Sequence, residues 1–445
     1  MLNAYDLRLA WHSIRRNPGL SALMVVAIAL GIAVCAITFT MYHAIARNPM
    51  ESKSSQLYSV TIDSWDPKQP ANENEPELPP MQLTWRDANT LYRAGIADRA
   101  VMMFKSGVVI DPGRPHVKPD QILLRVTTNE FFPMFEVPFQ FGGGWTHGAD
   151  EGPEPVIVLS HDMNQQLFAG ANSVGQSVTI DGRPFRVIGV MSDWHPSPKF
   201  YDLNNGVMDD AEDAYVPFRW GQVLEMQSYG NTNCWKNETI ATYQDFLNSE
   251  CVWIQMWAEL PTARKRDAFQ SYLDNYVRAQ KAVGRFPRPL NDHLYDVQQW
   301  LDVNKVVQKD NSVLVGIALL FLGVCIVNVV GLLLAKFLNN APMTGLRRAL
   351  GASRRDIVRQ HLAEVVIIGL AGGVLGVLSG VAGLVGIRSL YDFEYTREAY
   401  ERLTGIDVTV VLATLALAIF AGVIAGLYPA WRIGRTAPAA YLKTQ

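Results

Sequence analysis

The chain has 445 residues, of which 49% are hydrophobic and only 18% are charged, whereas a soluble globular protein has about 25% charged residues. This composition excludes a disordered chain, a collagen-like fibre and a disulfide-dense small domain. A formal net charge of −3 and an isoelectric point near 6.3 leave no overall basic field that would attract nucleic acid.

Apolar residues gather in four segments that contain no acidic or basic side chain. These segments cover residues 20–42, 313–335, 365–387 and 408–431. A run of about 23 residues forms a helix of roughly 35 Å, which is long enough to cross the hydrocarbon core of a bilayer. We therefore predict a membrane protein with four transmembrane helices, over 20–43, 312–336, 363–388 and 408–431. A large mixed α+β extracytoplasmic domain, over 44–311, is inserted between the first and second helices.

The first apolar segment has a second interpretation. Arg15 and Arg16 precede it and Ala44-Ile45-Ala46 follow it, which is the pattern of a cleavable signal peptide. Its apolar run, however, is about twice as long as that of such a peptide. We therefore expect the segment to stay in the protein as a transmembrane helix.

Basic residues near the ends of the segments predict the orientation, because short loops rich in Lys and Arg remain in the cytoplasm. Residues 1–19 and 432–445 are basic, and the 337–362 loop holds five arginines against one acidic residue, Asp356. Residues 45–310 instead hold 24 basic and 34 acidic residues. We expect both termini and the 337–362 loop in the cytoplasm, and the large domain and the short 389–407 loop on the other side.

Within the large domain, short strands alternate with helices. The residue pattern predicts strands over 55–63, 156–159, 177–180 and 185–190 and helices over 83–94 and 262–283. Asp181-Gly182 is typical of a tight hairpin turn. Residues 192–255 are loop-rich and hold four tryptophans, so we expect two lobes, with 192–255 forming a variable one.

Cys234 and Cys251 fall in this domain. Because disulfides persist outside the cytoplasm, we predict a bond between them, with two buried thiols as the alternative. Cys35 and Cys325 lie in apolar segments, where a thiol behaves as a small apolar side chain.

The sequence holds no motif for catalysis, metal binding or nucleotide binding. The P-loop pattern G-x-x-x-x-G-K-[ST] does not occur, and the eight histidines form no H-E-x-x-H pair. His161-Asp162 and Asp292-His293 come nearest to a metal or catalytic pair, and surface histidines are the commoner explanation. We therefore predict no catalytic, metal-binding or cofactor-binding residue in this chain, and no enzymatic activity of its own.

The four apolar segments lack the internal charges that mark ion or proton pathways. Asn328 is their strongest polar feature, and we expect it to join helices by a hydrogen bond. Gly372, Gly376 and Gly380 are spaced four residues apart, which allows another helix to approach closely. That helix belongs either to this chain or to a partner, and the sequence favours neither.

The basic loop mixes arginines with apolar residues. Leu346, Leu350 and Ile357 stand among five arginines in residues 343–361, and Ser353 is a candidate N-cap for the helix that follows. One interpretation is a segment that lies on anionic membrane lipid. The other is a pair of short helices, broken at Gly351, that presents an apolar and cationic surface to a cytoplasmic protein. Physical reasoning alone does not choose between them.

At this loop the sequence resembles the FtsX/MacB superfamily of ABC-transporter permeases. Residues 345–357 resemble the family's cytoplasmic coupling motif, and residues 426–442 resemble its C-terminal ending. Residues 126–135, 156–160, 174–182 and 185–190, together with Gly170, resemble the periplasmic core of MacB-type members. These regions follow the family's order over nearly the whole chain, except for 192–255.

The resemblance implies a permease of the bacterial inner membrane that dimerises, as a homodimer or a paralogous heterodimer, and binds one cytoplasmic ABC ATPase per protomer. ATP would bind to that separate ATPase, because the sequence has no fused nucleotide-binding domain of the MacB kind. ATPase closure would move the periplasmic domains by mechanotransmission and drive efflux or periplasmic export. A periplasmic adaptor and an outer-membrane duct are further expected partners. FtsX-like regulation of cell-wall hydrolases and Lol-like lipoprotein release are the alternatives.

The coupling motif assigns ATPase-coupling roles to nine residues of this chain: Gly345, Leu346, Arg347, Arg348, Leu350, Gly351, Arg354, Arg355 and Ile357. The leucines would enter an apolar cleft of the ATPase, and the arginines would pair with acids around it. The family usually has an acidic residue just before this motif, whereas residues 339–344 contain none. Pro342 would also interrupt a helix that continued from the second segment.

Overall fold

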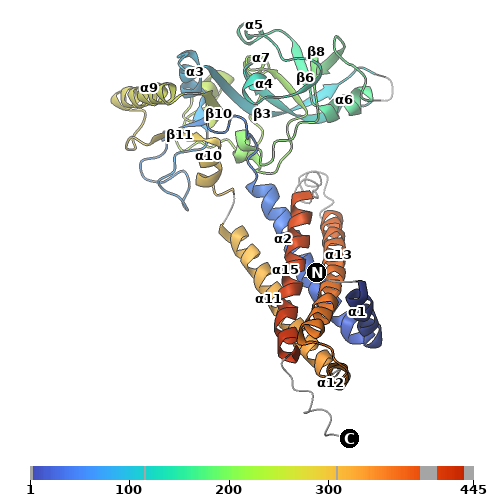
Figure 1. Cartoon of the computed structure of the whole chain (residues 1–445). Coiled ribbons are helices and arrows are strands. Elements are labelled where there is room, and N and C mark those ends of the chain that lie inside the picture. The colour runs from blue at the N-terminus through green and yellow to red at the C-terminus, as the bar shows by residue number, and fades with distance from the viewer. Residues whose placement is uncertain (1–3, 115–116, 307–308, 340, 391–407, 435–445) are drawn as a thin grey trace. The chain divides into compact units, whose positions relative to one another are not determined.

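The computed structural model describes residues 4–114, 117–306, 309–339, 341–390 and 408–434. The chain divides into two compact units (Figure 1). A helical unit is formed by residues 1–46 and 307–445, and an inserted domain by residues 47–306.

Four helices in the described part of the helical unit are long and apolar enough to cross a membrane. They are α2 (Pro18–Ala46), α11 (Lys309–Asn339), α13 (Arg354–Leu390) and α15 (Val408–Gly434). Two shorter helices, α1 (Ala4–Arg16) and α12 (Ala341–Ala349), complete the described part of this unit. The inserted domain lies in sequence between α2 and α11, so the predicted architecture of four membrane helices with one large insertion is confirmed.

Helix α13 packs against both α2 and α15, and α11 packs against α2. The row of glycines on α13 faces α2. A Cβ atom at Gly372 or Gly376 would lie 2.7 Å from the Cβ atom of Ile28 or Ile32, respectively, which is closer than two carbon atoms pack. The glycines therefore permit close packing inside this chain, which answers the question that the sequence left open.

Among the described residues, no hydrogen bond joins Asn328 of α11 to another helix. Its side chain lies on an exposed face of α11, whereas the neighbouring Cys325 and Val329 are buried. The role predicted for Asn328 is therefore not found within the described helical unit.

The described part of the inserted domain contains a mixed sheet of eleven strands in the order β11-β1-β10-β3-β4-β9-β6-β8-β5, with β2 beside β10 and β7 beside β3 and β8. The pairs β4–β9 and β6–β8 are parallel and the other pairs are antiparallel. The strands are β1 (Leu57–Ile62), β2 (Leu83–Thr84), β3 (Arg99–Asp111), β4 (Asp120–Thr127), β5 (Phe139–Gly142), β6 (Val156–Leu159), β7 (Ser177–Ile180), β8 (Arg183–Met191), β9 (Ala214–Pro217), β10 (Val252–Glu259) and β11 (Asp292–Asp296).

Helices surround this sheet: α3 (Trp85–Arg93), α4 (Phe131–Met134), α5 (His147–Glu151), α6 (His161–Phe168), the 3₁₀ helix η1 (Phe200–Asn205), α7 (Trp220–Val223), α8 (Tyr243–Asn248), α9 (Ala263–Ala282) and α10 (Val297–Val303). Local signals explain the predicted elements. Thr84 and Thr262 cap α3 and α9 with their hydroxyl groups. Asp181 and Gly182 both have positive φ, at 44° and 82°, as a two-residue hairpin turn requires.

The segment 192–255 differs from the variable lobe that we expected, because it is built into the sheet. It supplies β9, which lies between β4 and β6. It also supplies three members of a buried ion cluster, which we call the Arg125 cluster: Arg125, Lys199, Asp202 and Glu212. Arg125 Nη2 donates to Asp202 Oδ2 at 2.5 Å and also to Glu212, and Lys199 Nζ donates to Glu212 Oε1 at 2.6 Å.

All four side chains of the Arg125 cluster are buried. Burial alone would raise the pKa of Glu212, but the adjacent Arg125 and Lys199 cations outweigh this effect and hold its pKa well below the ordinary value. Removing one partner from such a cluster would leave an uncompensated buried charge. The cluster therefore fastens the loop-rich segment to β4.

A disulfide joins Cys234 to Cys251. The neighbouring residues Asn233 and Val252 exchange two backbone hydrogen bonds, of 3.1 and 2.9 Å. Both connections hold the loop around Cys234 against the start of β10.

Candidate coupling site at the basic end of the helical unit

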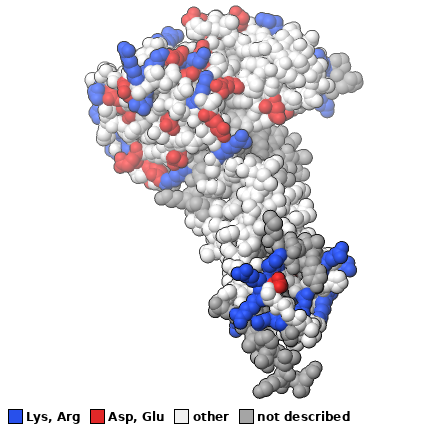
Figure 2. All heavy atoms as spheres, viewed as in Figure 1, with Lys and Arg blue, Asp and Glu red and all other residues white. Residues whose placement is uncertain are grey.

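Basic side chains gather at the end of the helical unit that carries α12, and Figure 2 shows uncharged side chains along the middle of its helices. The described arginines at this end come from four helices: Arg8, Arg15, Arg16, Arg347, Arg348, Arg354, Arg355, Arg359 and Arg432. This distribution is typical of a membrane-crossing unit with one basic aqueous end.

A tight turn connects α12 to α13. The amide of Gly351 donates to the carbonyl of Arg348 at 3.2 Å, and the amide of Ala352 donates to the carbonyl of Arg347 at 3.1 Å, which is a Schellman ending. Gly351 has a φ of 103°, a conformation that favours glycine. Ser353 then caps α13, because its hydroxyl accepts from the amide of Asp356 at 3.3 Å and its amide donates to the Asp356 carboxylate at 3.1 Å. The turn therefore fixes the angle between the two helices.

One face of α12, continued by the residue that follows the helix, carries an exposed row of apolar side chains, which we call the α12 stripe: Met343, Leu346 and Leu350. Leu350 comes directly after the last residue of α12, and its amide donates to the carbonyl of Leu346 at 3.0 Å. Their exposed fractions are 47%, 48% and 80%. The residues follow i, i+3, i+7 spacing, which places them on one side of a helix. Sequence reasoning identified the two leucines but missed Met343, although its position three residues before Leu346 was a usable signal.

The opposite face of α12 is buried, and it contains Ala341 and Gly345. Pro342 lies in the first turn of α12, where its missing amide hydrogen removes no helical hydrogen bond. Helix α11 ends at Asn339, and Asn340 lies outside the described residues. The break predicted at Pro342 therefore coincides with the start of a separate short helix.

Ile357 and Gly345 belong to the predicted coupling motif, and both are buried in this structure. Ile357 is only 3% exposed and packs in the apolar core of the helical unit. It lies at i, i+4 and i+7 spacing with the buried His361 and Glu364, so the helical period turns it away from the solvent. Gly345 is buried for the same reason on α12.

The arginines of the predicted motif have different surroundings. Arg347 is half-buried and donates to Gln360 Oε1 of α13 at 2.5 Å, so it braces α12 against α13. Arg348 is also half-buried, whereas Arg354 and Arg355 are exposed in the first turn of α13. The exposed surface at α12 is therefore the α12 stripe with a cationic border, which consists of Arg348, Arg354 and Arg355.

A buried polar cluster lies between the helices at this end of the unit. We call it the Lys336 cluster: Ser21, Lys336, His361 and Glu364. Lys336 Nζ forms an ion pair with Glu364 Oε1 and donates to Ser21 Oγ at 2.8 Å. His361 Nδ1 lies 4.0 Å from Glu364 Oε2. All four residues are buried, and they come from α2, α11 and α13.

The Lys336 cluster adds a buried charged pair at the ends of the apolar segments, which themselves contain no charge. Lys336 directly follows the apolar segment 313–335, and Glu364 directly precedes the segment 365–387. In the sequence each therefore looks like a residue that flanks a membrane segment. The structure pairs them, and the pair connects α11 to α13 beside the break between α11 and α12.

Within the described residues, no group of three or more His, Cys, Asp or Glu side chains is placed to hold a metal ion. His161 begins α6, and His293 on β11 contacts Asn291 Oδ1 at 2.8 Å. Burial raises the pKa of Asp292 to about 7, with a smaller contribution from Asp274, but Asp292 accepts from Gln270 at 2.9 Å. The contacts of His293 and Asp292 are hydrogen bonds within the inserted domain. The exposed surface of α12 is therefore the candidate functional site.

Residues 21–276 match the family model of the MacB-like periplasmic core domain, and residues 315–438 match that of the FtsX-like permease C-terminal region. The macrolide export ATP-binding/permease protein MacB of Syntrophobacter fumaroxidans is 24% identical over 71% of this chain. The match covers 46% of the length of that relative, so this chain spans about half of it. The uncharacterized ABC transporter permease YvrN of Bacillus subtilis is 23% identical over 70% of this chain and 67% of its own length.

Among solved structures, the periplasmic region of MacB from Actinobacillus actinomycetemcomitans aligns with 60% of this chain and 98% of its own length, at 15% identity and a TM-score of 0.37. The two family models cover the inserted domain and the membrane helices in the order in which the structure places them. The chain belongs to the FtsX/MacB superfamily of ABC-transporter permeases.

Proposed function

We propose that this chain is the membrane subunit of an ABC transporter that binds a separate cytoplasmic ATPase through the α12 stripe and its cationic border. The observation that carries this proposal is the exposure of Leu346 on α12 and of Leu350 directly after it, while the other face of this short helix is buried in the membrane unit. The relative from Syntrophobacter fumaroxidans is named for both ATP binding and permease activity, which supports an ATPase as the partner.

The energetics favour a docking role for the leucines. Burying both of them against a partner would contribute roughly 3–6 kcal/mol before association costs are subtracted. The surrounding arginines would pair with acidic residues at the rim, where ion pairs contribute more to the association rate and orientation than to affinity. The two leucines are therefore expected to matter more than any single arginine.

The structure also supports a route for mechanotransmission. Helix α13 follows α12 after a tight turn and runs as one helix to Leu390. Its glycine row packs closely on α2, and α2 is followed directly by the inserted domain at residue 47. The Lys336 cluster connects α2, α11 and α13. A displacement of α12 would thus reach both helices that flank the inserted domain in the sequence.

In this proposal the basic end of the helical unit faces the cytoplasm and the inserted domain lies in the periplasm, as the positive-inside rule requires. ATP binds to the partner ATPase, and two permease chains, identical or paralogous, form the transporter. The periplasmic domain moves to drive efflux or periplasmic export, with a periplasmic adaptor and an outer-membrane duct as further partners.

Co-purification with the ATPase tests the proposal. Leu350→Asp should abolish capture of the ATPase, because a carboxylate would be buried in an apolar cleft. Leu290→Asp is the matched control, since Leu290 is an exposed leucine of the inserted domain, and this variant should retain the ATPase. Arg355→Ala should weaken capture mainly at low salt, because higher salt screens the ion pair in the wild type as well.

Two results would contradict the proposal. If Leu350→Asp retained the ATPase at the wild-type ratio, the basic segment would not be the docking element. If the purified chain hydrolysed ATP alone, the ATPase would not be a separate subunit.

A further inference from the structure

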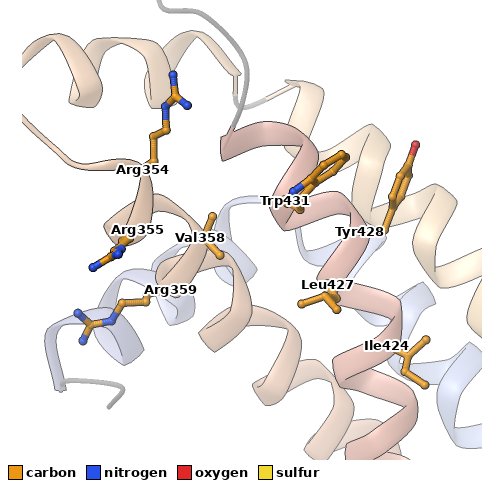
Figure 3. A pocket seen from close by; sticks show the side chains of 8 residues that line it. All are labelled: Arg354, Arg355, Val358, Arg359, Ile424, Leu427, Tyr428 and Trp431. Carbon is orange, nitrogen blue, oxygen red and sulfur yellow. The ribbon is translucent and has the colours of Figure 1, made fainter.

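A groove separates the first turns of α13 from the last turns of α15. Its volume is about 880 Å³, and Figure 3 shows the side chains that line it. Helix α13 contributes Arg354, Arg355, Val358 and Arg359, and helix α15 contributes Ile424, Leu427, Tyr428 and Trp431. Three arginines thus lie beside an apolar and aromatic wall, and these lining residues include no acid.

The two walls differ in chemistry. Arg354, Arg355 and Arg359 extend from the start of α13 in Figure 3. Guanidinium groups match the geometry of a phosphodiester and bind it with paired hydrogen bonds. Ile424 and Leu427 on the other wall are exposed apolar residues, and they lie within the apolar span of α15, which ends at Pro429.

We propose that this groove is a binding site for one anionic phospholipid. The arginines of α13 hold its phosphodiester, and an acyl chain lies along Val358, Ile424 and Leu427. This inference goes beyond the proposed coupling function, because it concerns a lipid in the groove between α13 and α15 and not the ATPase. Arg354 and Arg355 belong both to this groove and to the cationic border of the α12 stripe.

The depth of the groove favours a lipid over a protein as the occupant. The groove straddles the end of the apolar span of α15, which is the depth of the lipid headgroups. Tyr428 and Trp431 are about half exposed at this level, and aromatic residues with a polar edge are enriched there. The lining of the groove includes three arginines and no acid, so a headgroup with a net negative charge is favoured over a zwitterionic one.

Native mass spectrometry of the full-length chain in detergent, without any ATPase, tests this site. The delipidated chain is titrated with an equimolar mixture of dioleoyl phosphatidylglycerol and dioleoyl phosphatidylcholine, whose acyl chains are identical. The first lipid bound should be phosphatidylglycerol. Arg355→Gln/Arg359→Gln should weaken its binding by about twenty-five-fold, from roughly fivefold per arginine, and should leave phosphatidylcholine binding unchanged.

Two further variants make the test specific. Arg15→Gln/Arg16→Gln removes the same charge from exposed positions on α1, and it should keep the wild-type preference. Val358→Trp fills the groove without changing its charge, and it should weaken the binding of phosphatidylglycerol as well. Circular dichroism melts confirm that each variant is folded.

Four results would overturn the proposal, three from the lipid titrations and one from a competition experiment. The first is that the wild-type chain binds both lipids equally. The second is that Arg15→Gln/Arg16→Gln reduces the preference for phosphatidylglycerol as strongly as Arg355→Gln/Arg359→Gln does. The third is that Val358→Trp binds phosphatidylglycerol as well as the wild type does. Competition by sn-glycerol 3-phosphate separates a lipid site from a phosphate site. The proposal expects no displacement, and full displacement by this headgroup analogue would contradict it.

Discussion

The Lys336 cluster gives the sharpest stability prediction for the helical unit. Lys336 and Glu364 are both completely buried, and Lys336 Nζ also donates to Ser21 Oγ at 2.8 Å. Glu364→Leu removes the carboxylate and leaves a buried ammonium group with a hydroxyl as its described partner. Breaking one side of a buried ion pair costs about 3–5 kcal/mol, so we expect the midpoint of thermal unfolding to fall on the order of ten degrees.

The free cysteines provide an assay that is confined to this unit. Cys35 and Cys325 are buried in α2 and α11, whereas Cys234 and Cys251 are joined in the inserted domain. A maleimide dye that fluoresces on reaction with a thiol therefore reports the opening of the membrane helices during heating.

A double-mutant cycle supplies the control. Lys336→Met alone should destabilise the unit, because it leaves a buried carboxylate. Lys336→Met/Glu364→Leu removes both charges and should recover most of the lost stability, since apolar replacements of a buried pair are often neutral or stabilising. The reasoning would be refuted if Glu364→Leu unfolded at the wild-type temperature, or if the double variant were no more stable than either single variant.

Three further predictions concern other parts of the molecule. Desolvation favours the neutral form of Glu212, but two buried cations outweigh it and hold the pKa of Glu212 far below the ordinary value of 4.5. The contribution of ionised Glu212 to folding stability is therefore complete above pH 4.5, and it is lost as the pH falls toward the folded-state pKa. The Glu212→Gln variant should therefore be less stable than the wild type at neutral pH and should lose less stability as the pH falls. Tryptophan-fluorescence melts over a pH series measure this, and an equal loss of stability with pH in the variant and the wild type would contradict the prediction. Gly376→Val should destabilise the helical unit by about 1–3 kcal/mol, because the added side chain is overpacked against α2, and should therefore lower the midpoint temperature of the thiol-dye melt. Gly323→Val should not lower it, because there is open space around Gly323. Equal midpoints for the two variants would argue against the close packing. Maleimide should leave Cys234 and Cys251 unmodified in the denatured, unreduced chain, and labelling of all four cysteines would rule out the disulfide.

Local patterns in the sequence determined the architecture of this protein. Length and apolar composition are properties of a continuous segment, so the four membrane helices could be predicted without knowing their neighbours. Short strands with β-branched residues, such as β6 and β7, and the turn at Asp181-Gly182 are also local. Strand β10 was missed because it is buried along its whole length, so its sequence lacks the alternation that marks a strand with one solvent face.

Only the tertiary structure decided which residues meet and which face outward. The coupling motif contains Leu350 and Ile357, and both are apolar, but the turn at Gly351 and the helical period expose the first and bury the second. Arg125 with Glu212, and Lys336 with Glu364, are paired across long stretches of sequence. A charged residue that flanks a segment and one that pairs inside a bundle look alike in the sequence, because the partner that stabilises a buried charge comes from another part of the chain.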